Sequence, residues 1–186
     1  MKASQTTRKL TTIAMLAAVS IVLVALIRIP FPPAPFLEYD PADIPIFICT
    51  FLYGPVAGLG LTLVVSVIQG TTVSAGSGII GIVMHFLATG AFALLAGNLY
   101  RLRHNRVGAV VALGAGVAAM TVVMVFCNLI FTPIFMGTPI EAVIPMLLPV
   151  IIPFNLLKAG VNGIVTYFVY KPIARLVKHE HSEQPV

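Results

Sequence analysis

The sequence predicts an all-α membrane protein, a six-transmembrane-helix bundle with both termini cytoplasmic. Of its 186 residues, 59% are hydrophobic and 9% are charged, whereas soluble domains carry about 25% charged residues. The mean hydropathy is +1.03. At about 20 residues for each crossing, the chain has room for roughly six helices and for no extramembrane domain of useful size. We therefore expect a single membrane domain over residues 1–186.

Apolar runs bounded by glycine, proline and charge predict where each helix lies. We expect helices at about residues 10–29, 43–53, 55–70, 78–101, 107–132 and 148–175. The second and third are separated by Gly54 and Pro55. Both are too short to cross about 30 Å of hydrocarbon upright, so we expect them to be tilted or packed against the others, with a cavity near one face. The remaining segments are two loops at 30–42 and 133–147, the second with a short helix around 141–147, and a polar tail at 179–186.

The positions of the basic residues predict the orientation. With six helices, three clusters share one side of the membrane: Lys2, Arg8 and Lys9, then Arg101, Arg103 and Arg106, then Lys171, Arg175 and Lys178. The opposite side receives Glu38, Asp40, Asp43 and Glu141. Because basic residues accumulate on the cytoplasmic side, both long loops are expected to be external. The first apolar stretch exceeds a signal-peptide core of about 7–15 residues, so we interpret it as a retained helix.

Several functional classes are disfavoured by the same residues. The net charge is +5, but the basic residues form short clusters that topology explains, so we expect no nucleic-acid binding. Cys49 and Cys127 are isolated and have no metal-ligand spacing, so no metal site is expected. No HExxH, GxSxG or paired intramembrane carboxylates occur, which argues against an enzyme. The phosphate-binding pattern GxxxxGK[ST] is also missing, so any ATP is hydrolysed by another subunit.

A lysine inside the last apolar run is the main candidate for a binding site. Lys158 shares one helical face with Asn155 and Asn162. A cation at the centre of a membrane helix costs about 2.5–3.5 kcal/mol, so it persists where it faces a bundle interior, finds a partner or holds a ligand. We expect Asn155 and Lys158 to contact a small polar ligand. A structural role remains open, because Pro149 and Pro153 free backbone carbonyls nearby.

Other polar residues are expected around the same pocket. Asn128 lies near the outer end of the fifth helix, and the segment that contains Tyr39 and Asp40 lies above. An aromatic ring can cover a flat ligand while a carboxylate accepts hydrogen bonds, so we expect both to form a lid or wall. Asp43 is expected to be the N-cap of the second helix, and His85 a hydrogen-bonded core residue. The roles of Glu38, His85 and Asn162 stay open.

The chain resembles the substrate-binding (S) components of energy-coupling factor (ECF) vitamin transporters, and among them the riboflavin-specific type. The resemblance covers nearly the whole chain. It is based on Ala14-Met-Leu-Ala-Ala18, Phe36-Leu-Glu-Tyr-Asp-Pro-Ala-Asp-Ile-Pro45, Phe51-Leu-Tyr-Gly-Pro-Val-Ala-Gly58, Met84-His-Phe-Leu-Ala-Thr-Gly90 and Asn155-Leu-Leu-Lys158. Glu38 is an unexpected acidic residue for this family, and the chain has no tryptophan.

The resemblance implies a high-affinity binding subunit of an ECF-type ABC transporter for riboflavin uptake, in a prokaryotic plasma membrane. Riboflavin is then the transported ligand and no cofactor is expected. Asn128, Asn155 and Lys158 are implied to bond the ribityl hydroxyls or ring edge, with Tyr39 and Asp40 in the covering loop. The implied partners are a membrane coupling subunit and two cytoplasmic ATPases, with Ala14 and Ala18 docking on the coupling subunit. Alternatives are an S component for another vitamin, or a stand-alone flavin facilitator or secondary transporter.

Overall fold

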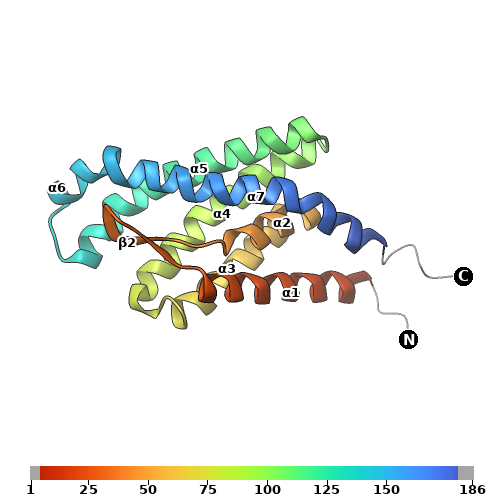
Figure 1. Ribbon diagram of the computed structural model, residues 1–186, viewed down its shortest axis with the longest axis horizontal. Helices are drawn as coiled ribbons and strands as arrows, with labels where there is room; N and C mark the ends of the chain where they lie inside the picture. Colours follow the sequence, from red (N-terminus) through yellow and green to blue (C-terminus); the bar gives the residue numbers. More distant parts are fainter. Residues whose placement is uncertain (1–4, 180–186) are drawn as a thin grey trace, which may run out of the picture.

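The computed structural model describes residues 5–179, which form a bundle of lengthwise helices (Figure 1). Within that range, six helices have eleven residues or more. They are α1 (Gln5–Leu26), α2 (Asp43–Tyr53), α3 (Pro55–Thr71), α4 (Gly78–Leu102), α5 (Arg106–Met136) and α7 (Ile152–His179). Residues 1–4 and most of the tail expected at 179–186 lie outside the described range.

Helix length separates these elements into two groups. Four segments among the described residues are long and apolar enough to cross a membrane: Gln5–Leu26, Ala75–Leu102, Arg106–Met136 and Ile140–Val177. In contrast, α2 has 11 residues and α3 has 17. At 1.5 Å per residue they are about 16 and 25 Å long, less than the roughly 30 Å of a hydrocarbon core.

The segment that follows α1 is a β-hairpin, where the sequence had indicated only a loop over 30–42. Strand β1 (Ile29–Phe31) pairs antiparallel with β2 (Ala34–Tyr39), and Ile29 lies opposite Tyr39. Proline lacks the N–H of a sheet ladder, but a two-stranded sheet has outward-facing edges that tolerate it. The hairpin is held by a small apolar cluster in which Ala34 and Leu37 pack with Phe154 of α7.

The second expected loop, 133–147, is largely helical. Helix α5 continues past Pro133 to Met136, and the C-cap residue Gly137 has a left-handed φ of 63°, which suits glycine. A short helix α6 (Ile140–Val143), a 3₁₀ turn (Ile144–Met146) and a π-helical turn (Leu147–Ile151) then lead into α7. Prolines at 145, 149 and 153 remove backbone donors here. Tighter and wider turns therefore precede the regular part of α7.

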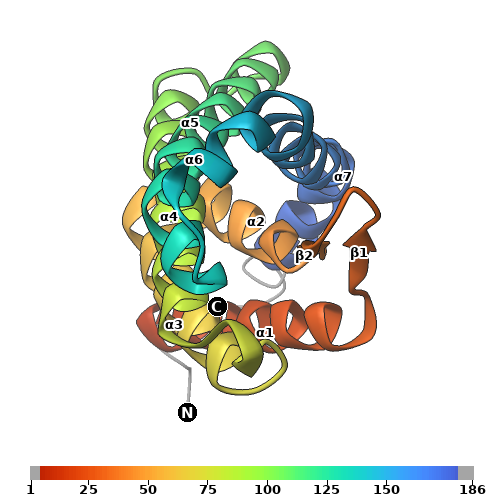
Figure 2. The same ribbon diagram turned by 90° about the vertical axis from the view of Figure 1, so that its left-hand side faces the viewer.

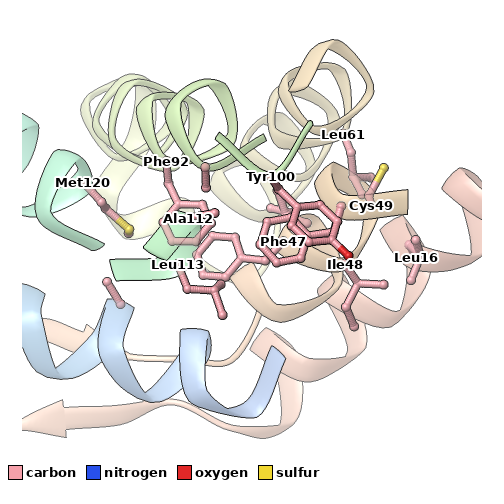
Figure 3. Close-up of a cluster of buried hydrophobic side chains, with 14 of the residues drawn as sticks. Leu16, Phe47, Ile48, Cys49, Leu61, Phe92, Tyr100, Ala112, Leu113 and Met120 are labelled. Carbon is pink, nitrogen blue, oxygen red and sulfur yellow. The ribbon is translucent and has the colours of Figure 1, made fainter. Parts of the chain in front are cut away.

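The apolar core is formed by residues of α1, α2, α3, α4, α5 and α7 (Figure 3). The Phe47 and Phe92 rings stack in it with centroids 3.5 Å apart and an interplanar angle of 11°. Small residues bring the helices close together. A β-carbon at Gly58 would lie 2.0 Å from the Thr50 hydroxyl, and one at Gly97 would lie 2.8 Å from the Thr50 methyl. These glycines allow α2, α3 and α4 to pack backbone against backbone.

The bundle has two chemically different ends. At one end, the Lys9 ammonium lies 5.6 Å from the centroid of the Tyr53 ring, and the Arg101 guanidinium packs against Gly54 in the turn between α2 and α3. The C-terminal part of α7, which carries Lys171, reaches the same end (Figure 1). We call this the basic end. The opposite end, which carries the hairpin and the α3–α4 turn, is called the hairpin end.

Candidate functional site

A cavity of about 190 Å³ opens at the hairpin end. Its lining residues come mainly from α3, α4, α5, α7 and the hairpin, and Figure 2 shows these elements from that end of the bundle. Typical small-molecule sites measure about 300–1,000 Å³, so a drug-sized ligand requires these walls to adjust. The lining residues are Phe36, Leu37, Glu38, Asp40, Gln69, Gly70, Ser74, Ser77, Ile80, Gly81, Met84, His85, Ala88, Met120, Met124, Asn128, Thr132, Phe135, Phe154, Asn155 and Lys158.

Lys158 lines this cavity and forms an ion pair with Asp40. The Lys158 Nζ lies 2.6 Å from the Asp40 Oδ2, and the two side chains are 13% and 12% exposed. The other carboxylate oxygen of Asp40 accepts a hydrogen bond from the backbone N–H of Ala42 at 3.1 Å. Lys158 therefore has an anionic partner within the chain, which meets the requirement that a buried cation be paired. This pairing joins α7 to the end of the hairpin.

Asn128 and Asn155 also line the cavity, each fixed to its own helix. The Asn128 amide donates to the Met124 carbonyl at 2.7 Å and accepts from the Thr132 hydroxyl at 2.9 Å. The Asn155 amide donates to the Ile151 carbonyl at 2.8 Å. An asparagine amide has two N–H donors and two acceptor lone pairs. Each residue therefore keeps hydrogen-bonding capacity while its orientation is set by the preceding turn.

Tyr39 is not among the cavity-lining residues, although the sequence had suggested a wall or lid. Its hydroxyl donates to the Asn162 Oδ1 at 3.0 Å, and the Asn162 amide donates to the Asp40 backbone carbonyl at 3.1 Å. Burial, and next the neighbouring Asp40 carboxylate, raise the pKa of the Tyr39 phenol above 10, so the phenol stays a donor at neutral pH. The hydrogen bonds of Tyr39 and Asn162 thus connect the hairpin to α7, in addition to the Lys158–Asp40 ion pair.

The expectation that Asp43 caps the second helix is wrong. Ala42 occupies the N-cap position of α2, and no side chain caps that end. The fully buried Asp43 carboxylate instead accepts from the Thr89 hydroxyl at 2.9 Å and lies 3.1 Å from the His85 Nε2. It also accepts from the Asn162 amide at 3.4 Å. The Asp43 carboxylate points into the bundle, so it bonds to side chains of other helices and not to the backbone N–H groups of the first turn of α2.

His85 connects this buried network to the cavity. Its Nδ1 lies 2.7 Å from the Ser66 hydroxyl, which itself donates to the Thr62 carbonyl at 2.6 Å. His85 is therefore hydrogen-bonded on both ring nitrogens, and it also lines the cavity. A serine, a histidine and a carboxylate from α3, α4 and α2 thus form one continuous polar chain beneath the site.

Sequence reasoning missed several lining residues. Met84, Met120 and Met124 form part of the apolar walls, and nothing in an apolar helix distinguishes a core methionine from a lining one. Gln69 is different, because it is a buried amide near the end of α3 whose Oε1 has no hydrogen-bond partner within residues 5–179. A lone glutamine in the apolar run 55–70 was a usable signal.

Glu38 has a defined place at the mouth of the cavity. Its carboxylate accepts from the Arg28 Nε at 2.9 Å, and Arg28 also donates to the Val73 backbone carbonyl. The Arg28 side chain therefore connects the hairpin to the turn between α3 and α4. Both side chains are about one-third exposed, so the strength of this pair is reduced by water.

The first helix presents its small residues outward. Ala14 and Ala18 are both exposed on α1, next to Met15 and Val19, which are 64% and 47% exposed. By contrast, Gly116 of α5 packs against Phe92 and Ala96 of α4. Gly116 of α5 thus lies inside the bundle, whereas Ala14 and Ala18 of α1 lie on its outer face.

Comparisons with known proteins agree with this architecture. The family model described as "ECF transporter, substrate-specific component" matches residues 8–170. A "Riboflavin transporter FmnP" from Bacillus subtilis (strain 168) is 29% identical over 184 residues, covering 94% of this chain and 96% of the relative. A "Riboflavin transporter RibU" from Staphylococcus aureus (strain TCH60) is 31% identical over 184 residues, covering 94% of each chain.

A solved structure is also similar. It is described as the S component of a bacterial ECF transporter and matches with a TM-score of 0.79 and 30% identity. The match covers 94% of this chain and 99% of that structure. The family is one of transporter components and not of enzymes. From its fold, its cavity and these comparisons, the chain belongs to the family of substrate-specific (S) components of ECF transporters.

Proposed function

We propose that this protein binds riboflavin or a closely related flavin in the cavity at the hairpin end, as the high-affinity S component of an ECF-type ABC transporter. The observation that carries the proposal is the composition of the cavity. Its lining combines the amides of Asn128 and Asn155 and the Lys158–Asp40 pair with several methionine and phenylalanine side chains. Relatives described as riboflavin transporters support the choice of vitamin.

The chemistry of a flavin suits such a cavity. Its tricyclic ring is flat and largely apolar, and flexible methionine side chains can pack on both faces of a ring. Its ribityl chain carries hydroxyls that both donate and accept hydrogen bonds. Two amides and a paired ammonium and carboxylate supply both kinds of partner. We assign the ribityl chain to Asn128, Asn155, Lys158 and Asp40. Tyr39 acts indirectly, by holding Asn162 and the hairpin in place.

We further propose that the basic end faces the cytoplasm and that the four long segments and the shorter α2 and α3 all lie in the membrane. Lys9, Arg101 and Lys171 gather at that end, and basic residues accumulate on the cytoplasmic side of membrane proteins. The cavity then opens outward, where a vitamin arrives. On this proposal the α1 surface that contains Ala14 and Ala18 docks on a membrane coupling subunit. Two cytoplasmic ATPases supply the energy.

Purification and uptake measurements test the proposal in two stages. The protein purified from riboflavin-fed cells is expected to carry a yellow chromophore, identified as riboflavin after extraction. Cells that express the coupling subunit, the ATPases and this chain are expected to accumulate labelled riboflavin. Cells that lack the coupling proteins are expected to accumulate none. Uptake that persists without the coupling proteins would favour the stand-alone facilitator instead.

A further inference from the structure

We infer that Gln69 determines specificity in the cavity, by bonding the imide edge of the bound flavin ring through its side-chain amide. The inference deepens the proposed function and rests on it. Gln69 lies near the end of α3, is 7% exposed and lines the cavity. Its Oε1 is buried and has no hydrogen-bond partner within residues 5–179. Buried polar atoms are normally paired, so an unpaired one on a cavity wall indicates a partner supplied by a ligand.

The side chain of Gln69 is not needed to build the local turn. The backbone carbonyl of Gln69 accepts from the N–H of Ser74 at 2.7 Å and from that of Thr72 at 3.3 Å. These bonds end α3 and start the turn toward α4 without any contribution from the amide. The side-chain amide of Gln69 therefore has no role in this turn, although burying a polar group costs free energy.

Gln69 also comes from a different helix than the α7 residues assigned to the ribityl chain. It comes from α3, whereas Asn155 and Lys158 come from α7, and the two helices lie on opposite sides of the bundle (Figure 2). Methionines of α4 and α5 complete the walls. The cavity thus has polar groups from α3 as well as from α7, and the methionines of α4 and α5 add apolar surface. A flavin has the same distribution, with hydroxyls on one substituent and an imide on the far ring.

An amide matches an imide edge in hydrogen bonding. The flavin imide presents an N–H donor beside a carbonyl acceptor, and a glutamine amide presents an acceptor beside donors. Two parallel bonds can therefore form at once. The last torsion of a glutamine side chain is broad, so the amide can turn to present either atom to the cavity. The Ser74 and Ser77 hydroxyls, which also line the cavity, are available to the second imide carbonyl.

The test compares two probes on wild-type protein and on Gln69→Met, which keeps the length of the side chain and removes the amide. The probes are riboflavin and riboflavin methylated on the imide nitrogen, which lacks the donor. Wild type is expected to bind riboflavin at least about tenfold more tightly than the methylated probe. Gln69→Met is expected to lose about tenfold for riboflavin and to bind the two probes within about threefold. Thr138→Val, which removes another buried unpaired atom away from the cavity, is expected to keep the wild-type pattern.

Binding of the methylated probe and the melting temperature of the ligand-free protein report whether Gln69→Met is folded. Gln69→Met is expected to melt no lower than wild type, because an unpaired buried carbonyl is removed. The inference is overturned if Gln69→Met keeps the wild-type affinity and preference for riboflavin. It is also overturned if the folded variant binds neither probe. If wild type itself fails to bind riboflavin, the proposed function fails and the inference with it.

Discussion

Replacing Lys158 by methionine is the sharpest perturbation of the site. The substitution keeps a long, flexible side chain and removes the charge that pairs with Asp40 at 2.6 Å. Breaking a buried ion pair from one side costs about 3–5 kcal/mol. Because both side chains keep some exposure, 13% and 12%, we expect a value near the lower limit, about 3 kcal/mol. At about 2–4 °C per kcal/mol for a chain of this size, the melting temperature falls by about 6–12 °C.

The same substitution is expected to weaken riboflavin binding. A hydrogen bond to a charged group contributes about 1.5–3 kcal/mol, which corresponds to a loss of about 10- to 150-fold in affinity. The assay is quenching of riboflavin fluorescence during titration with detergent-solubilised protein. Lys171→Met is the matched control, because this lysine lies on the same helix, is exposed and belongs to the basic end. It is expected to change neither the melting temperature nor the affinity.

A double variant separates the two roles of Lys158. In Lys158→Met with Asp40→Asn, no unpaired charge remains, so most of the lost stability is expected to return. The affinity is expected to stay low because the Lys158 ammonium is absent, whereas the amide introduced by Asp40→Asn still offers an acceptor oxygen to the ribityl chain. An affinity of the single variant within about threefold of wild type would refute the assignment of Lys158 as a ligand donor. Full recovery of binding in the double variant would refute it as well, and would leave Lys158 only a structural role.

Three further substitutions test other parts of the account. Asn155→Leu is expected to lower riboflavin affinity about tenfold. Thr121→Val is the control, because it removes a similar hydrogen bond from a side chain to the carbonyl four residues earlier, away from the cavity, and it is expected to leave the riboflavin affinity unchanged. Ala18→Leu is expected to abolish ATP-driven uptake while the purified chain keeps its affinity; intact uptake would move the docking surface elsewhere. Arg28→Gln is expected to raise the riboflavin dissociation rate severalfold in stopped-flow chase experiments, because the hairpin loses its contact with the turn between α3 and α4. An unchanged rate would show that this contact does not retain the bound vitamin.

The boundary between α2 and α3 was indicated by the sequence. The expected segments at 43–53 and 55–70 correspond closely to α2 and α3, since Gly54, with its φ of 91°, is an unambiguous break. The hairpin was not predictable in the same way. Its prolines suppress the usual strand signal, and its fold depends on packing against Phe154, more than a hundred residues away.

The candidate site was predicted in part. Asn128, Asn155 and Lys158 line one cavity, because a polar residue in an apolar helix is expected to face the bundle interior. Asp40 lines the same cavity but lies in the connection between β2 and α2, so this rule does not account for it. The partners of these residues could not be derived, since the Lys158–Asp40 pair spans 118 positions in the chain. The Asp43 expectation failed for a similar reason. Local capping rules describe a helix end in water, and this carboxylate is fully buried among side chains from other helices.

The most direct test of the central claim is an equilibrium titration of the purified, ligand-free protein with riboflavin, thiamin, folate and pantothenate. We expect riboflavin to bind in the micromolar range or tighter, at one molecule per chain, with the other three vitamins at least about a thousandfold weaker, a difference of about 4 kcal/mol. Such selectivity is expected when analogues leave buried amides and charges unpaired. Riboflavin binding no tighter than millimolar, with tight binding of another vitamin, would contradict the account.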